Sequence, residues 1–114
     1  MQYAIADFLD DCPQHHYELG GFYQAKRDRF LELMAGSRFS MRPSAGTYFQ
    51  LAEYSEISDE EDTVFSARMT REDGVATIPV SVFYRDPPDQ RIVRFCFAKH
   101  DETLVKAADI LRYL

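Results

Sequence analysis

The stretch RIVRFCFAK at residues 91–99 carries the strongest strand pattern in the sequence, which predicts a strand over 91–98. Side chains alternate between the two faces of a strand, so Val93, Phe95 and Phe97 share one face and form a core face. The opposite face is mostly apolar and small, with one guanidinium among its side chains: Ile92, Arg94, Cys96 and Ala98. A charged side chain in the middle of an otherwise apolar strand needs an explanation.

Arg94 is a candidate anchor for an acidic ligand. A buried guanidinium needs a carboxylate or phosphate partner, because desolvating an unpaired charge is very costly. Its planar fork binds a carboxylate through two parallel hydrogen bonds. The alternative is an arginine at a sheet edge that is solvated or paired with a local Asp or Glu. Periodicity alone favours this alternative, because most arginines are exposed.

Two helical patterns lie at the N-terminal end of the chain. Apolar side chains at helical spacing predict a helix over 2–10, which a proline then breaks. A longer pattern predicts a second helix over 14–35, although Gly20 and Gly21 each weaken it by about 1 kcal/mol relative to alanine. Gly36 is well placed to end this second helix.

The middle of the chain alternates short strand patterns with turns. Aromatic and β-prone residues predict a strand over 47–52, and shorter strands are expected over 39–42 and 75–78. Residues 43–46 are expected to form a turn. Residues 79–90 are expected to form a loop, because the segment contains two adjacent prolines.

A third helix is predicted between these strands. Ser58 is a candidate N-cap, and Glu61 lies three residues later as in a capping box. The acidic run at 59–62 then lies in the first turn, where the helix dipole stabilises negative charge, and this position explains the run sufficiently. Gly74 is expected to end the helix. Its apolar face consists of Val64, Phe65 and Met69.

A final helix completes the pattern. It is expected to begin at His100 or Asp101, and one stripe of apolar residues lies along it: Leu104, Ala107, Ala108, Leu111 and Leu114. The element order predicts an α+β fold in which helices pack on one face of a mainly antiparallel sheet of three or four strands.

Composition narrows the classes of function. A chain of 114 residues suffices for one domain. Its net charge of −6 argues against nucleic-acid binding, and no apolar run is long enough to span a membrane. An amphipathic, acid-containing segment follows Met1 at once, so we expect no secretory signal and a cytoplasmic location.

Cys12 and Cys96 fit free thiols in a reducing compartment better than a disulfide, although a bridge remains an alternative. The neighbouring His15 and His16 point about 100° apart on a helix, which disfavours a shared metal ion.

Four stretches together resemble the C-terminal part of the class I/II aminotransferases. They are FYQAKRDRF (22–30), AGTYFQLAEYSEISDEED (45–62), GVATIPVSVFY (74–84) and RIVRFCFAKHDETL (91–104). The similarity is greatest to the branch that contains methionine and kynurenine aminotransferases. It covers essentially the entire chain, with several motifs in the family's order.

The resemblance implies the fold type I pyridoxal-phosphate scaffold, which has a large cofactor domain and a small C-terminal domain and works as a dimer. Residues 1–36 then correspond to a helical segment leading from an absent large domain, and residues 37–114 to the small domain. The position matching Arg94 binds the α-carboxylate of the substrate. Phe49 is similar to a residue that lines the substrate pocket. The segment IPVSVFY (78–84) resembles a loop near the mouth of the site, to which we assign no chemistry.

The resemblance also shows what this chain lacks. Transamination needs a lysine that holds the cofactor as a Schiff base. The lysines of this chain, Lys26, Lys99 and Lys106, do not match the family's motif for that residue. We therefore expect pyridoxal 5′-phosphate in the full-length enzyme, none bound covalently to this chain, and a fragment that is inactive by itself.

The hypothesis with the most support is that this chain is part of an enzyme that transfers an amino group from a methionine-like, aromatic or kynurenine-like amino acid to a 2-oxo acid. One alternative is a non-catalytic, stand-alone dimerisation or acid-binding module. Another is a cysteine-conjugate β-lyase of the same cofactor family. We also expect self-association into a homo-oligomer, because Phe8, Phe22 or Phe30 would expose apolar surface without a large domain.

Overall fold

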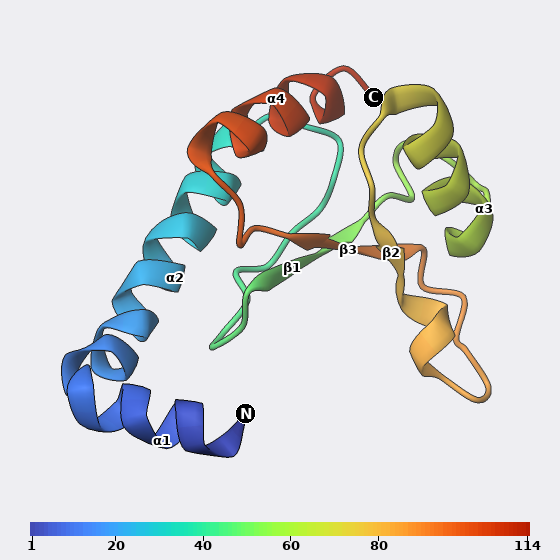
Figure 1. Ribbon diagram of the computed structural model, residues 1–114. Helices are drawn as coiled ribbons and strands as arrows, with labels where there is room; N and C mark the ends of the chain where they lie inside the picture. The colour runs from blue at the N-terminus through green and yellow to red at the C-terminus, as the bar shows by residue number, and fades with distance from the viewer.

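The computed structural model describes residues 1–114, with four α-helices and a three-stranded sheet; α1 lies beside α2, away from the sheet (Figure 1). The predicted α+β class is therefore confirmed. Helix α1 (Gln2–Asp11) ends before Pro13, which is the first residue of α2 (Pro13–Leu33). Proline suits this position because the first helical residue has no intrahelical partner for an amide hydrogen. The glycine pair leaves α2 unbroken, and Gly36 lies in the turn after it with φ of +82°.

The sheet has the order β1-β3-β2, and both pairings are antiparallel. The central strand β3 (Ile92–Cys96) lies within the predicted strand over 91–98, between β1 (Phe49–Glu53) and the short β2 (Ile78–Pro79). The strand expected over 39–42 is reduced to a single bridge between Ser40 and Glu53. The Gln50 side-chain amide donates to the Arg42 carbonyl at 2.6 Å. This carbonyl therefore bonds to a side chain instead of to the backbone of a neighbouring strand.

The predicted capping box is wrong. Helix α3 (Asp62–Arg68) begins four residues after Ser58, and the Ser58 hydroxyl bonds the backbone N–H and the carboxylate of Glu60 instead of capping the helix. A π-helical turn, η1 (Met69–Asp73), extends the helix to Gly74. Gly74 has φ of +72°, in the left-handed region where glycine is favoured, so the predicted end of the helix is confirmed.

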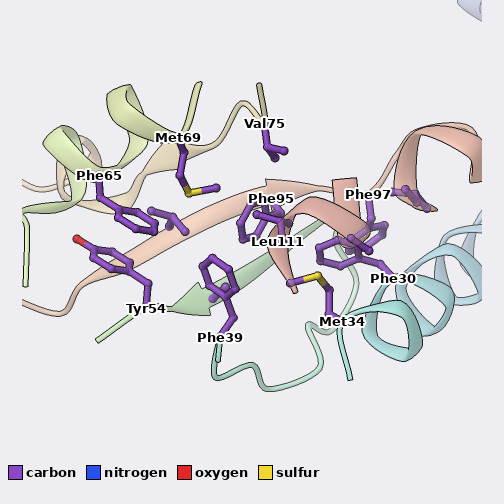
Figure 2. Close-up of a cluster of buried hydrophobic side chains, with 14 residues drawn as sticks. Phe30, Met34, Phe39, Tyr54, Phe65, Met69, Val75, Phe95, Phe97 and Leu111 are labelled. Carbon is purple, nitrogen blue, oxygen red and sulfur yellow. The ribbon is translucent and has the colours of Figure 1, made fainter. Parts of the chain in front are cut away.

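The core lies on one face of the sheet and is rich in aromatic rings (Figure 2). Phe95 and Phe97, from the predicted core face of β3, pack there with Phe30 of α2 and with Leu111 of α4 (Asp101–Leu111). The expectation that Phe30 is exposed is wrong, because α4 and β3 cover it and leave it 2% exposed. The buried hydrophobic residues are Phe30, Met34, Phe39, Ala52, Tyr54, Phe65, Met69, Val75, Val93, Phe95, Phe97, Leu104, Ala108 and Leu111.

The helices leave apolar side chains at the N-terminal end of the molecule. No residue of α1 is buried, and Phe8 of α1 and Phe22 of α2 are about half exposed. These two positions agree with the expected apolar surface. None of the helices combines the length and the hydropathy that a membrane span requires. Cys12 and Cys96 are both exposed free thiols.

Candidate functional site

Arg94 lies at the middle of the central strand. In the sheet register it pairs with Leu51 of β1 on one side and with Ile78 of β2 on the other. Its neighbours along the strand, Val93 and Phe95, are buried, whereas Arg94 itself is half-buried. The alternation of β3 therefore presents the guanidinium on the sheet face opposite the core, where Leu51 and Ile78 are also partly exposed.

Two aromatic rings hold the guanidinium. The Arg94 Cζ atom lies 4.7 Å from the centroid of the Phe49 ring and 5.3 Å from that of the Phe83 ring. Both distances are within the range of a cation–π interaction. The structure thus brings together the two residues that the sequence singles out, Arg94 and Phe49, and adds Phe83.

The guanidinium of Arg94 has no acidic partner in the chain. Its side chain forms no ion pair, and only its backbone carbonyl takes part in a side-chain hydrogen bond, accepting from Thr77 Oγ1 at 2.9 Å. Four other arginines do pair with carboxylates: Arg27, Arg29, Arg68 and Arg91. A half-buried guanidinium without a carboxylate is unusual in a chain with a net charge of −6, and its N–H donors remain available to a ligand.

The paired arginines show what an acidic partner does elsewhere in this chain. Arg68 donates hydrogen bonds to Glu60, and these, together with a hydrogen bond from the Ser58 hydroxyl, lower the pKa of the Glu60 carboxyl. Arg29 of α2 donates to Asp101 at the start of α4 at 2.9 Å and lowers the pKa of that carboxyl in the same way. The Arg29–Asp101 pair joins α2 to α4, and the Arg68–Glu60 pair joins α3 to the segment before it, whereas no carboxylate neutralises Arg94.

Local contacts fix Phe49 at the start of β1. The Thr47 hydroxyl donates to the Phe49 carbonyl at 2.8 Å and accepts from the Phe49 N–H at 3.4 Å. The Tyr48 ring meets the Phe49 ring edge-on, with centroids 5.5 Å apart. The Tyr48 carbonyl in turn accepts a hydrogen bond from Phe97 N at 3.0 Å, so the turn before β1 is tied to the end of β3.

Phe83 is the residue of this cluster that no sequence pattern indicates. It ends the short 3₁₀ helix η2 (Val80–Phe83), which follows β2 in the segment expected to be a loop. Ser81 of the same turn donates to Asp62 of α3 twice, from its backbone N–H at 2.7 Å and from its hydroxyl at 2.6 Å. The only signal in the sequence is the resemblance that places IPVSVFY near the mouth of the site, because no periodicity connects residue 83 with residue 94.

A polar cavity of about 360 Å³ lies at the start of α3. Asp62, Ser81 and Arg91 line it, and Arg94 and Phe49 do not. Its residues form no metal site, because no group of three or more His, Cys, Asp or Glu side chains comes together in this chain. The lysines also lie elsewhere: Lys26 Nζ donates to the Lys99 carbonyl at 2.6 Å. Lys99 and Lys106 line an apolar groove along α4 to which Arg94 does not belong.

Comparisons with known proteins agree on one family. Residues 1–110 match the model of aminotransferase class I and II. A methionine aminotransferase of Escherichia coli is 44% identical over 113 residues, which are 99% of this chain and 29% of that protein. A kynurenine–oxoglutarate transaminase of Dictyostelium discoideum is 34% identical over 95% of this chain and 29% of that protein.

Solved structures give the same result. The crystal structure of an E. coli methionine aminotransferase superposes with a TM-score of 0.92 at 44% identity, over 99% of this chain and 30% of that chain. N-succinyldiaminopimelate aminotransferase from Mycobacterium tuberculosis superposes with a TM-score of 0.83 at 34% identity, over 98% of this chain and 29% of that chain. The chain spans about 29% of the length of the curated relatives that it matches.

Proposed function

Because this chain belongs to the class I and II aminotransferase family, we propose that it supplies the substrate-carboxylate site of a pyridoxal-phosphate-dependent aminotransferase. The family resemblance predicted from the sequence is confirmed, and the cofactor of this family is pyridoxal phosphate. In the proposed enzyme, residues 37–114 form the small domain, and residues 1–36 lead to it from the remainder of the polypeptide.

The observation that carries the proposal is the free guanidinium of Arg94. A half-buried arginine without a carboxylate partner can bind an α-carboxylate through two parallel hydrogen bonds. Amino acids and 2-oxo acids both carry this carboxylate, so one arginine serves both substrates of a transamination. Fixing the carboxylate holds the adjacent carbon in a reactive position. Phe49, next to the guanidinium, lines the pocket for the substrate side chain.

The three lysines of this chain lie in α2, after β3 and in α4. Lys26 is bound to the Lys99 carbonyl, and Lys99 and Lys106 lie along α4. We therefore propose that the lysine that holds the cofactor belongs to another part of the enzyme. After borohydride treatment with pyridoxal phosphate, the 114-residue chain should retain no stoichiometric cofactor. Retention of one equivalent would contradict this assignment.

A chimera tests the proposed function. Residues 1–114 replace the matching 29% of E. coli methionine aminotransferase, and transamination of methionine is measured. We expect an active enzyme in which Arg94→Ala raises the KM for methionine about 100-fold, since two charge-assisted hydrogen bonds are lost. Arg71→Ala is the matched control, because Arg71 is exposed and forms no ion pair. A folded, cofactor-loaded chimera without activity, or an unchanged KM in Arg94→Ala, contradicts the proposal.

The product of the reaction separates a transaminase from a lyase. With a cysteine conjugate as substrate, the proposed transaminase forms the corresponding 2-oxo acid and aminates its co-substrate. A β-lyase would instead break the Cβ–S bond and release the thiol, ammonia and pyruvate. We expect the first pattern to dominate in the chimera. Predominant release of ammonia would favour the lyase.

A stand-alone binding module is the second candidate function, and the exposed side chains of Phe8 and Phe22 favour it. Apolar surface of this kind is typical of an interface. Members of the family typically form dimers, and we propose that the enzyme containing this chain is a homo-oligomer. An active chimera whose activity depends on Arg94 would exclude a purely structural module.

A further inference from the structure

We propose that Phe83 is a positioning residue for the Arg94 guanidinium, and that the contact between Ser81 and Asp62 keeps Phe83 in place. The inference rests on the proposed function, because it concerns how the carboxylate-binding arginine is oriented. It assigns a role to Phe83, an aromatic residue in a loop, and a further role to Asp62, the last residue of the acidic run at 59–62.

The two rings reach Arg94 from opposite sides of its strand. Phe49 belongs to β1, and Phe83 belongs to η2, which continues directly from β2. Since β3 lies between β1 and β2, one ring comes from the element on each side of the arginine. The ring centroids lie 4.7 Å and 5.3 Å from the guanidinium carbon. A long, flexible side chain is thereby confined before any ligand arrives.

Aromatic rings suit this task better than a carboxylate does. A carboxylate would hold the guanidinium, but it would occupy the N–H donors and neutralise the charge that a substrate needs. A ring attracts the cation through its π-face and leaves those donors free. Confinement lowers the conformational entropy that arginine loses on binding, and so it strengthens binding without a new contact to the substrate.

Asp62 holds the turn that carries Phe83. Its two carboxylate oxygens accept hydrogen bonds from the Ser81 N–H at 2.7 Å and from the Ser81 hydroxyl at 2.6 Å. Tyr84 N donates to the Ser81 carbonyl at 3.0 Å and closes the same turn. Asp62 is the first residue of α3, and Phe65 anchors that helix in the core. The position of the Phe83 ring thus depends on a packed helix and not on the loop alone.

Phe83 contributes little to the core. Its side chain is 63% exposed and is not among the residues of the hydrophobic cluster. Replacing it should therefore leave the fold intact, which allows a functional test. Val82, its neighbour in the same turn, is similarly exposed and provides a matched control.

A first experiment observes the contact in the 114-residue chain itself. The Nε–Hε resonance of Arg94, assigned by its loss in Arg94→Lys, should carry a ring-current shift in a ¹⁵N–¹H spectrum. Phe83→Leu should reduce this shift, and Asp62→Asn should do the same, because an amide nitrogen cannot accept a hydrogen bond from Ser81. Val82→Ala should leave it unchanged. If the chemical shift of the Arg94 Nε–Hε resonance is unchanged in both Phe83→Leu and Asp62→Asn, the proposal is wrong.

A second experiment measures the functional effect in the methionine aminotransferase chimera. Phe83→Leu should raise the KM for methionine about 3- to 10-fold, the effect of one cation–π contact, with kcat changed by less than about twofold. Phe83→Tyr should restore the KM, because its ring also has a π-face. Asp62→Asn should raise the KM to a similar degree, and its effect should not add to that of Phe83→Leu.

The outcomes separate this inference from the proposed function. If Arg94→Ala raises the KM and Phe83→Leu does not, the positioning role is wrong and the carboxylate site stands. If Arg94→Ala leaves the KM unchanged, the proposed function itself is wrong. A general loss of stability would lower the activity of Phe83→Tyr as well, so rescue by tyrosine distinguishes positioning from a structural defect.

Discussion

Tyr54 and Phe65 stack face to face, with ring centroids 3.9 Å apart and ring planes 1° from parallel. Tyr54 follows β1 directly, Phe65 belongs to α3, and both are fully buried. The Tyr54 hydroxyl donates to the Glu60 carbonyl at 2.7 Å, in the segment that leads into α3. The pair therefore attaches α3 to the sheet, and α3 carries the carboxylate that holds the turn at Ser81.

Phe65→Ala should destabilise the protein by about 3–5 kcal/mol, because the substitution leaves a cavity beside Tyr54 and Phe39. Urea unfolding followed by circular dichroism measures the effect. Val64→Ala is the control, since Val64 is 52% exposed, and it should change the stability by less than about 0.5 kcal/mol. Equal losses in the two variants would show that Phe65 is not the residue that anchors α3.

Alkaline pH should destabilise the fold through Tyr54. Burial raises the pKa of the Tyr54 hydroxyl to about 12, whereas an unfolded tyrosine titrates near 10. The folded state therefore favours the protonated form, so this stabilisation is complete below about pH 10 and is lost as the pH rises through about 12. Absorbance at 295 nm should show a high-pH step that disappears in Tyr54→Phe. A Tyr54 signal at the ordinary pKa would contradict the buried position.

Arg29→Gln should return the pKa of Asp101 to its ordinary range, because the hydrogen bond from Arg29 is the main cause of its lowered value. A lowered pKa stabilises the fold above the unfolded value near 3.9, and the stabilisation disappears as the pH falls through the folded value. NMR titration of the Asp101 carboxyl measures the change. Arg112→Gln is the control, because Arg112 is exposed and unpaired, and it should leave the Asp101 titration where it is.

Replacing Gly20 and Gly74 with alanine should change the stability of the protein in opposite directions. Gly20 lies inside α2 with open space around it, so Gly20→Ala should stabilise the protein by about 1 kcal/mol. Gly74 ends the helical segment with φ of +72°, so Gly74→Ala should cost about 1–2 kcal/mol. Urea midpoints provide the comparison. A loss of stability in Gly20→Ala would show that another surface packs closely against α2.

The 114-residue chain should self-associate through its N-terminal helices. Phe8 and Phe22 are 43% and 54% exposed, and apolar surface of this kind favours association in water. Sedimentation velocity should show a concentration-dependent increase in mass, and the double variant Phe8→Ser/Phe22→Ser should remove it. Tyr113→Ser, at the exposed C-terminal end, is the control. A clean monomer at high concentration would contradict the prediction.

Sequence patterns predict the structure correctly where it depends on the residues of a single helix or strand. The period of β3 predicts which side chains are buried, the apolar stripe predicts α4, and Gly74 predicts the end of the third helical segment. These patterns give a wrong prediction where a group outside the pattern takes the expected hydrogen-bond partner. Ser58 matches the capping-box pattern, yet it bonds Glu60, whose carboxylate also binds Arg68 eight residues away.

The α+β class, the core face of β3 and the family can be predicted without coordinates, because they follow from periodicity and from motifs that are continuous along the chain. The folded chain was needed to show that Arg94 has no acidic partner and that Phe83 lies with Phe49 beside it. Strand pairing brings Phe49 of β1 beside the strand that carries Arg94, and such contacts depend on register and on loop geometry that no local pattern encodes.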